Sequence, residues 1–424
     1  MTLLALVGSI LYTELGNNTT NQAFEYPDKP RATRQVEVVP AAYTHAYTTD
    51  GPRSLAELLA LPSDEIEKLD IALINLLCAE GLPGAEDIDI AGTLATLDRW
   101  AEHVRQETER HLYRLERERD DWGTEARWRV GWLATTLQQD CGVRYNPDRI
   151  TDIDFTNSQD LFIHGLARPG LHPVRQIDHP EAAHALRQST HGGTCASMPV
   201  LYAAVARRLG YPVTLSTTQA HVFCRWDGNA SGEDPWQPPG KTHGQTSGAT
   251  SGGHANPGYR DRFNFEATGR GVHLHDDAHY LAWPHPITQA YADEHGYLQS
   301  QNNTAALAGF LASRGHCLLD LGRLKQAQHA YAHAIRLNPD DPNFRSFLAE
   351  ARQRLHPAQH RTERAHRRAE QAIPQRHNAW AQRLIAESQQ RPRPRNHPHQ
   401  HPQLTQPQHP DLHDPDTPHR PPGY

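Results

Sequence analysis

In one segment of the chain the spacing of apolar residues changes abruptly from that of a helix to that of a strand. This change limits the folds that the chain can adopt. The segment reads HGGTCASMPVLYAAVARRLGYPVTLSTTQAHVFCRW and begins at His191. From Met198 to Leu209 apolar residues recur at helical spacing, and the Gly-Tyr-Pro that follows ends the helix. Residues 213–226 are rich in β-branched and aromatic side chains with a break at 216–219, which predicts two strands joined by a turn. We therefore expect an α+β fold in which this helix packs on an antiparallel sheet.

The same segment places a cysteine ahead of the helix and a histidine at the start of a strand. The glycine-rich run before Cys195 has little helix preference, so we expect Cys195 at or just inside the helix N-terminus. There the helix dipole and unpaired backbone N–H groups lower the pKa of a thiol and can stabilise an oxyanion. His221 opens the strand that ends at Trp226 and can act as the base. The two residues form a candidate nucleophile and base.

A third group is needed to orient the imidazole. The next strand-like run, from Arg262 to Glu266, alternates polar and apolar residues and so directs Asn264 and Glu266 to one face. Glu266 is our first choice for the third member and Asn264 the second. Asp227 is a weaker candidate, because an aspartate beside Gly228 is expected in a turn for conformational reasons alone.

This order of residues resembles the transglutaminase-like superfamily, whose chemistry is papain-type: a cysteine on a helix, a histidine on the first following strand and an acid on the next strand. More narrowly, the chain is similar to the SirB group of bacterial proteins, in which such a core precedes tetratricopeptide repeats. The resemblance covers roughly residues 55–355. The matching residues are Gly193, Thr194, Cys195, Leu201, Tyr202, Ala206, Arg207, Arg208, Leu209, Gly210, Pro212, His221 and Phe223, with 142–147 and 160–165 as a lead-in.

The resemblance implies a nucleophile at Cys195, a base at His221 and an acid at Glu266. The family usually has aspartate at the acid position, and the extra methylene of glutamate shifts the carboxylate. Related cores often lack the cysteine, whereas this chain keeps it. The implied activity is acyl transfer or amide hydrolysis on a protein or peptide through a thioester. An amine acceptor would make a transglutaminase, and water would make a protease or amidase.

A non-catalytic alternative remains open on the sequence. In that interpretation the core is a peptide-binding or regulatory scaffold, and the tetratricopeptide-like segment docks a partner through a groove at Ala327 and Tyr331. The sequence does not choose between enzyme and scaffold.

Metal binding is the main competing use of cysteine and histidine. The spacing of His273, His275 and His279 could suit a metal, but the chain has no CxxC or HExxH motif. We therefore predict neither a metal nor a cofactor, and expect the three histidines near the rim of the active site. The other cysteines are predicted to be buried structural residues, as free cysteines usually are: Cys78, Cys141, Cys224 and Cys317.

Changes in pattern predict five segments. Residues 1–52 form a loosely ordered leader, 53–141 a helical lead-in with core tryptophans, and 142–298 the core with a low-complexity insertion at 228–258. Residues 299–355 form a tetratricopeptide-like helical hairpin, with Gly315, Tyr331 and Pro339 at the spacings of such a repeat and a capping helix from Asp341. The final segment, 356–424, is rich in His, Pro, Gln and Arg and is predicted to be disordered.

The charge and the cysteine content limit the cellular compartment and the binding partners that we expect. Five cysteines without regular spacing argue for a reducing compartment, and the apolar start of the chain is too short to span a bilayer. We expect a cytoplasmic protein that binds no membrane. The tail holds ten Arg against six acidic residues while the whole chain has a net charge of -7. No nucleic-acid fold accompanies the tail, so nucleic acid is not an expected partner.

Overall fold

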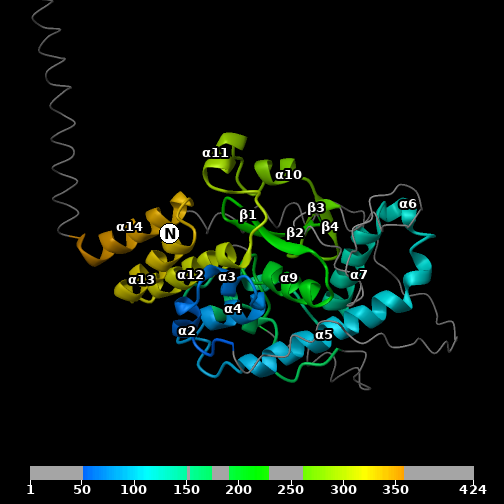
Figure 1. Cartoon of the computed structure of the whole chain (residues 1–424), viewed down its shortest axis with the longest axis horizontal. Coiled ribbons are helices and arrows are strands. Elements are labelled where there is room, and N and C mark those ends of the chain that lie inside the picture. Colours follow the sequence, from blue (N-terminus) through cyan, green and yellow to red (C-terminus); the bar gives the residue numbers. More distant parts are fainter. Residues whose placement is uncertain (1–50, 150–152, 174–190, 229–260, 358–424) are drawn as a thin grey trace, which may run out of the picture. The chain divides into compact units, whose positions relative to one another are not determined.

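The computed structural model describes residues 51–149, 153–173, 191–228 and 261–357 (Figure 1). Helices precede and follow a small sheet, in agreement with the predicted α+β class. The first helices are α2 (Leu55–Ala60), α3 (Ser63–Ile66), α4 (Ile71–Cys78), α5 (Ile90–Arg110), α6 (Arg119–Trp122) and α7 (Glu125–Gln139), with the 3-10 turns η1 (Leu112–Arg114), η2 (Pro147–Arg149), η3 (Ser158–Asp160) and η4 (Ile163–Gly165). Then follow α9 (Met198–Arg208), β1 (Val213–Thr218), β2 (His221–Asp227), β3 (Arg262–Glu266), β4 (His273–His275), α10 (Asp277–Ala282), α11 (Gln289–Glu294), α12 (Asn303–Asp320), α13 (Leu324–Leu337) and α14 (Pro342–Leu355).

The strands form a four-stranded antiparallel sheet in the order β1-β2-β3-β4. One apolar row crosses it, because Leu215 pairs with Cys224, Cys224 with Phe265, and Phe265 with Leu274. The predicted strand pair is therefore present, but its turn comes later than the break at 216–219. β1 continues to Thr218, which pairs with His221 across a two-residue turn. His221 consequently begins the second strand after the helix, not the first.

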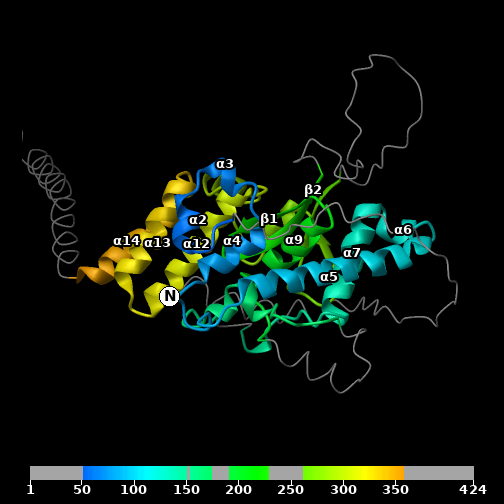
Figure 2. The ribbon, with the colours of Figure 1, turned by 60° about the horizontal axis from the view of Figure 1, so that its bottom comes forward.

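Helix α9 lies beside β1 and β2 in both views of the ribbon (Figures 1 and 2). The helix begins at Met198, as the apolar spacing predicts, and all but one of its residues are buried. Alternation along β2 divides the sheet into two faces. Cys224 belongs to the main apolar cluster that holds α9, whereas its neighbour Phe223 belongs to a second cluster with Tyr280 of α10. The sheet is therefore covered on both faces.

The helical lead-in packs on α9 through α4, α5 and α7. Asp70 caps α4 by accepting from the N–H of Ala72, so the apolar residues from Ile66 to Leu77 are divided between α3 and α4. The tryptophans at positions 100, 128 and 132 are buried, as predicted for core residues. Among the described residues, no helix is both long enough and apolar enough to cross a membrane.

Helices α12 and α13 pack against each other, and α14 packs on α13. Gly315 allows the close approach, since a Cβ there would come within 2.3 Å of the Tyr331 ring. The side-chain amide of Asn303 donates to the carbonyl oxygens of Ile66 and Leu69, which anchors α12 to the lead-in. The α12–α13 hairpin is therefore supported by its contacts with the helical lead-in.

Three predicted segments fall largely or wholly outside the described residues. They are the leader at 1–52, the insertion at 228–258 and the tail at 356–424. The described residues belong to one unit that ends at Pro357.

Candidate active site

Cys195 lies in a turn that leads into α9 rather than in the helix itself. The helix begins three residues later, at Met198. The prediction that Cys195 sits at or just inside the helix N-terminus was therefore off by one turn. The shift has a local cause, because Thr194 accepts from the N–H of Ala196 through its hydroxyl and from the N–H groups of Ser197 and Met198 through its carbonyl. A side-chain turn thus precedes the first helical residue.

The glycines ahead of Cys195 allow this turn to lie against its neighbours. Gly192 has φ of +87°. A Cβ on Gly193 would come within 2.6 Å of Met198 and 2.8 Å of Leu166. The backbone of Gly193 also exchanges hydrogen bonds with its neighbours, donating to Arg144 O at 3.0 Å and accepting from Asn146 N at 2.8 Å. The turn is therefore tied to residues 144–146.

His221 and Glu266 form a buried pair at the start of β2 and the end of β3. His221 Nε2 lies 2.9 Å from Glu266 Oε2, and the two residues are 2 % and 8 % exposed. The other carboxylate oxygen, Oε1, accepts from the backbone N–H of Thr268 at 3.1 Å and from its hydroxyl at 2.6 Å. The hydroxyl of Tyr280 donates to Oε2 at 3.4 Å. All these contacts hold the carboxylate toward the imidazole.

The electrostatics of this pair favour charge on both partners. Burial lowers the pKa of His221, but the Glu266 charge and the contacts with Cys195 and Glu266 outweigh it and raise the pKa to about 10. Burial likewise raises the pKa of Glu266, and the His221 charge with the hydrogen bonds from His221 and Thr268 lowers it to about 2. At neutral pH the pair is an imidazolium and a carboxylate.

Cys195 completes the group. Its thiol lies close enough to the imidazole to raise the pKa of His221. Because Glu266 occupies Nε2, the nitrogen left for the thiol is Nδ1, which is buried and has no hydrogen-bond partner of standard geometry within the described residues. The contact is therefore looser than a standard hydrogen bond, as is common in active sites without substrate. The thiol is itself buried, with Cys195 3 % exposed.

Tyr145 reaches the same point from the lead-in. Burial raises the pKa of its hydroxyl, the charges of Cys195 and Glu266 raise it further, and the nearby backbone N–H of Cys195 opposes them. Tyr145 is held there because it bridges to Gly193 in parallel pairing. The phenol therefore lies near the backbone N–H of Cys195. The sequence contained no spacing signal for this placement.

Aromatic rings cover the imidazole on the α10 side. The ring of Trp283 meets His221 edge-on at a centroid distance of 4.7 Å, and Tyr280 lies 6.3 Å from it, nearly parallel. Tyr280 also stacks on Phe223 at 3.7 Å. This cover keeps water from the pair and strengthens its electrostatic coupling.

The other candidates for the third member lie elsewhere. Asn264 shares a face with Glu266, as predicted, but its side chain accepts from Arg225 Nε at 2.7 Å and donates to Asp277 at 2.8 Å. Asp227 ends β2, at the opposite end of the strand from His221, and its carboxylate accepts from Ser300. The geometry therefore brings only Glu266 to the imidazole among these three.

The predicted histidine cluster lies beside the aromatic cover. The rings of His275 and His279 stack at 3.7 Å, and His279 lies 5.5 Å from Trp283. Burial and the neighbouring His279 lower the pKa of His275 to about 4. Over the ranges that the structure describes, no group of three or more His, Cys, Asp or Glu is arranged to hold a metal ion.

The remaining cysteines are free and buried, as predicted. Cys224 lies on the same strand as His221, and its thiol donates to the carbonyl of Pro199 at 3.3 Å. Burial, with the charge of Glu266, raises the pKa of Cys224 well above its ordinary value. This thiol is the natural internal reference for Cys195.

Comparison of the chain with protein-family models, with curated proteins and with solved structures finds no match.

Proposed function

We propose that the chain is a cysteine-dependent acyl transferase or amide hydrolase with a transglutaminase-like core. The observation that carries the proposal is the buried His221–Glu266 pair at 2.9 Å, with the second ring nitrogen left for the Cys195 thiol. A carboxylate, an imidazole and a thiol in this order form the arrangement by which cysteine nucleophiles are activated. In this proposal α12 and α13 form one tetratricopeptide-like hairpin that supports the core.

The reaction follows from the charge state of the site. The Cys195 thiolate attacks the carbonyl carbon of a carboxamide or peptide, and the carbonyl oxygen takes the negative charge. The backbone N–H of Cys195 stabilises this oxygen. The His221 imidazolium gives its proton to the leaving nitrogen, the C–N bond breaks, and a thioester remains.

Deacylation returns the enzyme to its starting state. Neutral His221 takes a proton from water or from a primary amine, which attacks the thioester carbonyl and releases the Cys195 thiolate. Glu266 stabilises the imidazolium that forms again. Water yields a carboxylic acid, and an amine yields a new amide.

Alkylation of the full-length protein with iodoacetamide at pH 6, mapped by mass spectrometry, tests the nucleophile. An ordinary thiol is less than about 1 % ionised at this pH, so a preformed thiolate–imidazolium pair should react more than about tenfold faster. We expect modification at Cys195 and not at Cys224, because burial and the charge of Glu266 raise the pKa of the Cys224 thiol well above its ordinary value. The proposal fails if Cys195 in the folded chain reacts no faster than in the urea-unfolded chain.

Turnover is tested by incorporation of a fluorescent primary amine into a glutamine-containing protein and by release of amine from peptide amides. Cys195→Ala should abolish any activity found. The matched variant Cys224→Ala changes a buried cysteine on the neighbouring strand and should retain activity, because its thiol bonds only to the carbonyl of Pro199. Equal activity in Cys195→Ala and the parent chain would contradict the mechanism.

The scaffold alternative is favoured by one observation: Cys195, His221 and Glu266 are all buried. Its predicted docking groove needs correction, however, because Ala327 and Tyr331 are fully buried between helices and line no open surface. The scaffold function predicts that Cys195→Ala still captures a peptide partner. It also predicts that Cys195 of the parent chain reacts no faster than an ordinary thiol.

A further inference from the structure

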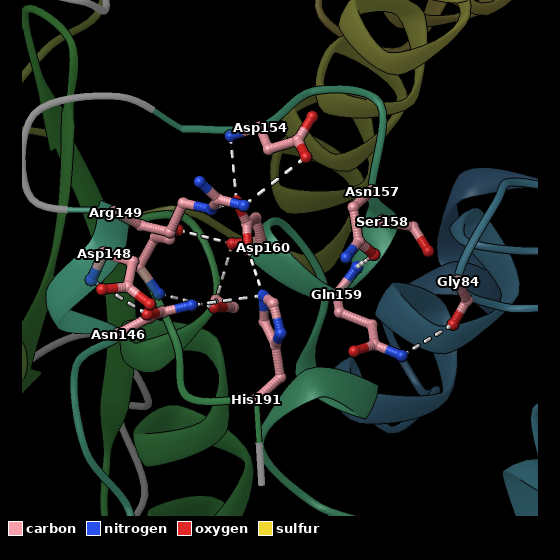
Figure 3. Close-up of polar contacts among 12 residues, drawn as sticks. Gly84, Asn146, Asp148, Arg149, Asp154, Asn157, Ser158, Gln159, Asp160 and His191 are labelled. Carbon is pink, nitrogen blue, oxygen red and sulfur yellow. Dashed lines mark hydrogen bonds and ion pairs between the residues drawn. The ribbon is translucent and has the colours of Figure 1, made fainter.

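A second buried polar network lies directly behind the nucleophile turn, and it centres on Asp160 (Figure 3). Asp160 is 0 % exposed. One carboxylate oxygen accepts from the backbone N–H of Asp154 at 2.9 Å and forms an ion pair with Arg149 Nε at 2.7 Å. The other oxygen contacts Nε2 of His191. The buried charge is therefore fully partnered.

The main chain of Asp160 holds the turn itself. Its carbonyl oxygen accepts from the hydroxyl of Thr194 at 2.6 Å and from that of Ser197 at 3.4 Å. Both hydroxyls belong to the turn that contains Cys195, and Ser197 Oγ also accepts from the N–H of Thr194 at 3.0 Å. Thr194 and Ser197, on either side of Cys195, thus both donate hydrogen bonds to the carbonyl oxygen of Asp160.

The side chain of Asp160 joins this turn to the segment that carries Tyr145. His191 precedes the turn and contacts both Asp160 and the side-chain amide of Asn146, 3.3 Å away. Arg149 extends from the same segment as Asn146 (Figure 3). Asp160 therefore contacts Arg149 and Asp154 on one side and the more distant residues His191, Thr194 and Ser197 on the other.

We propose that Asp160 is a positioning residue that holds the turn from Thr194 to Ser197, and with it the Cys195 thiol, against His221 and Tyr145. Loss of its charge frees His191 and Arg149, so that the turn opens more often and the thiol leaves the imidazole. This inference rests on the proposed function for its catalytic meaning, but the turn itself can be observed without any activity.

The experiment compares Asp160→Asn with Asp140→Asn by amide hydrogen exchange of the full-length protein. Asp140 is a matched control, because it is a buried aspartate paired with a histidine, His103, at 2.9 Å. We expect exchange in the peptide covering 191–198 to rise by about tenfold or more in Asp160→Asn, the factor that one charge-assisted hydrogen bond contributes to local opening. Asp140→Asn should leave that peptide unchanged.

A second readout separates positioning from general support. In Asp160→Asn the rate of Cys195 alkylation, taken relative to the rate in the urea-unfolded chain, should fall, whereas Asp140→Asn should keep the parent ratio. If Asp160→Asn does not fold, Thr194→Val removes only the hydroxyl and should also accelerate exchange at 191–198.

The outcomes are distinct. Equal acceleration of exchange in the Asp160 and Asp140 variants, or no acceleration in the Asp160 variant, overturns the positioning role. Accelerated exchange confined to the turn supports the positioning role of Asp160, whatever the reactivity of Cys195. Slow alkylation of Cys195 in the parent chain, at the rate of an ordinary thiol, refutes the proposed function and leaves the positioning role standing.

Discussion

The buried His221–Glu266 pair makes the stability of the protein depend on pH in a specific way. Glu266→Gln keeps the shape of the side chain and its acceptor for Thr268 but removes the charge that faces the imidazolium 2.9 Å away. Removing one partner of a buried ion pair costs about 3–5 kcal/mol. We expect a loss of this order in the free energy of unfolding, at the pH where both groups are charged in the folded state.

The pH window follows from the two shifts, which describe one interaction and are counted once. The pKa of His221 rises from 6.5 to about 10, so its contribution is complete below 6.5 and is lost as pH rises toward 10. The pKa of Glu266 falls from 4.5 to about 2, so its contribution is complete above 4.5 and is lost as pH falls toward 2. The difference between parent and variant should be largest between pH 4.5 and 6.5.

Urea unfolding followed by circular dichroism at pH 5.5, 7.5 and 9.5 measures this difference. The matched control is Asp277→Asn, since Asp277 forms an ion pair with Arg225 on the same face of the sheet. Arginine stays charged throughout this range, so the cost of that variant should be constant with pH. A cost for Glu266→Gln that is equally constant would refute the assignment of an imidazolium to His221.

Two further predictions test the neighbours of the site and the helical hairpin. Tyr145→Phe removes the hydroxyl that lies near the backbone N–H of Cys195 and leaves this N–H to a developing oxyanion. Because a hydrogen bond contributes about 0.5–1.5 kcal/mol, amine incorporation should rise about 2- to 10-fold; a large fall would instead identify the phenol as an oxyanion donor. Gly315→Ala places a Cβ 2.3 Å from the Tyr331 ring and should lower the free energy of unfolding by about 1–3 kcal/mol in thermal melts. Gly309→Ala in the same helix meets nothing within 4 Å and should stabilise by about 0.5–1 kcal/mol, so equal effects would contradict the packing argument.

The elements around the site could be predicted from local patterns. Apolar spacing predicts the helix that α9 forms, although its start was expected near Cys195 and lies at Met198, and alternation predicts β3 from Arg262 to Glu266 with the observed bounds. Both signals are short in range, because they depend on the period of a helix or a strand and on the residues that end it. The same alternation places Asn264 and Glu266 on one face, and it cannot choose between them.

Only the tertiary structure decided that choice. Arg225, buried on the neighbouring strand, takes the side chain of Asn264, and Thr268 turns the Glu266 carboxylate toward His221. Tyr145 and Asp160 likewise meet the nucleophile turn because segments distant in sequence pair there.

The sequence by itself therefore determined the α+β class, the helix, three of the four strands in the described residues and the candidate residues Cys195, His221 and Glu266, since periodicity and turn residues act within a few positions. The register of the sheet, the start of α9 one turn beyond Cys195 and the partners of each buried charge came only from the tertiary structure. The physical reason is that a buried polar group must find a partner across space, and residue spacing along the chain does not specify which partner that is.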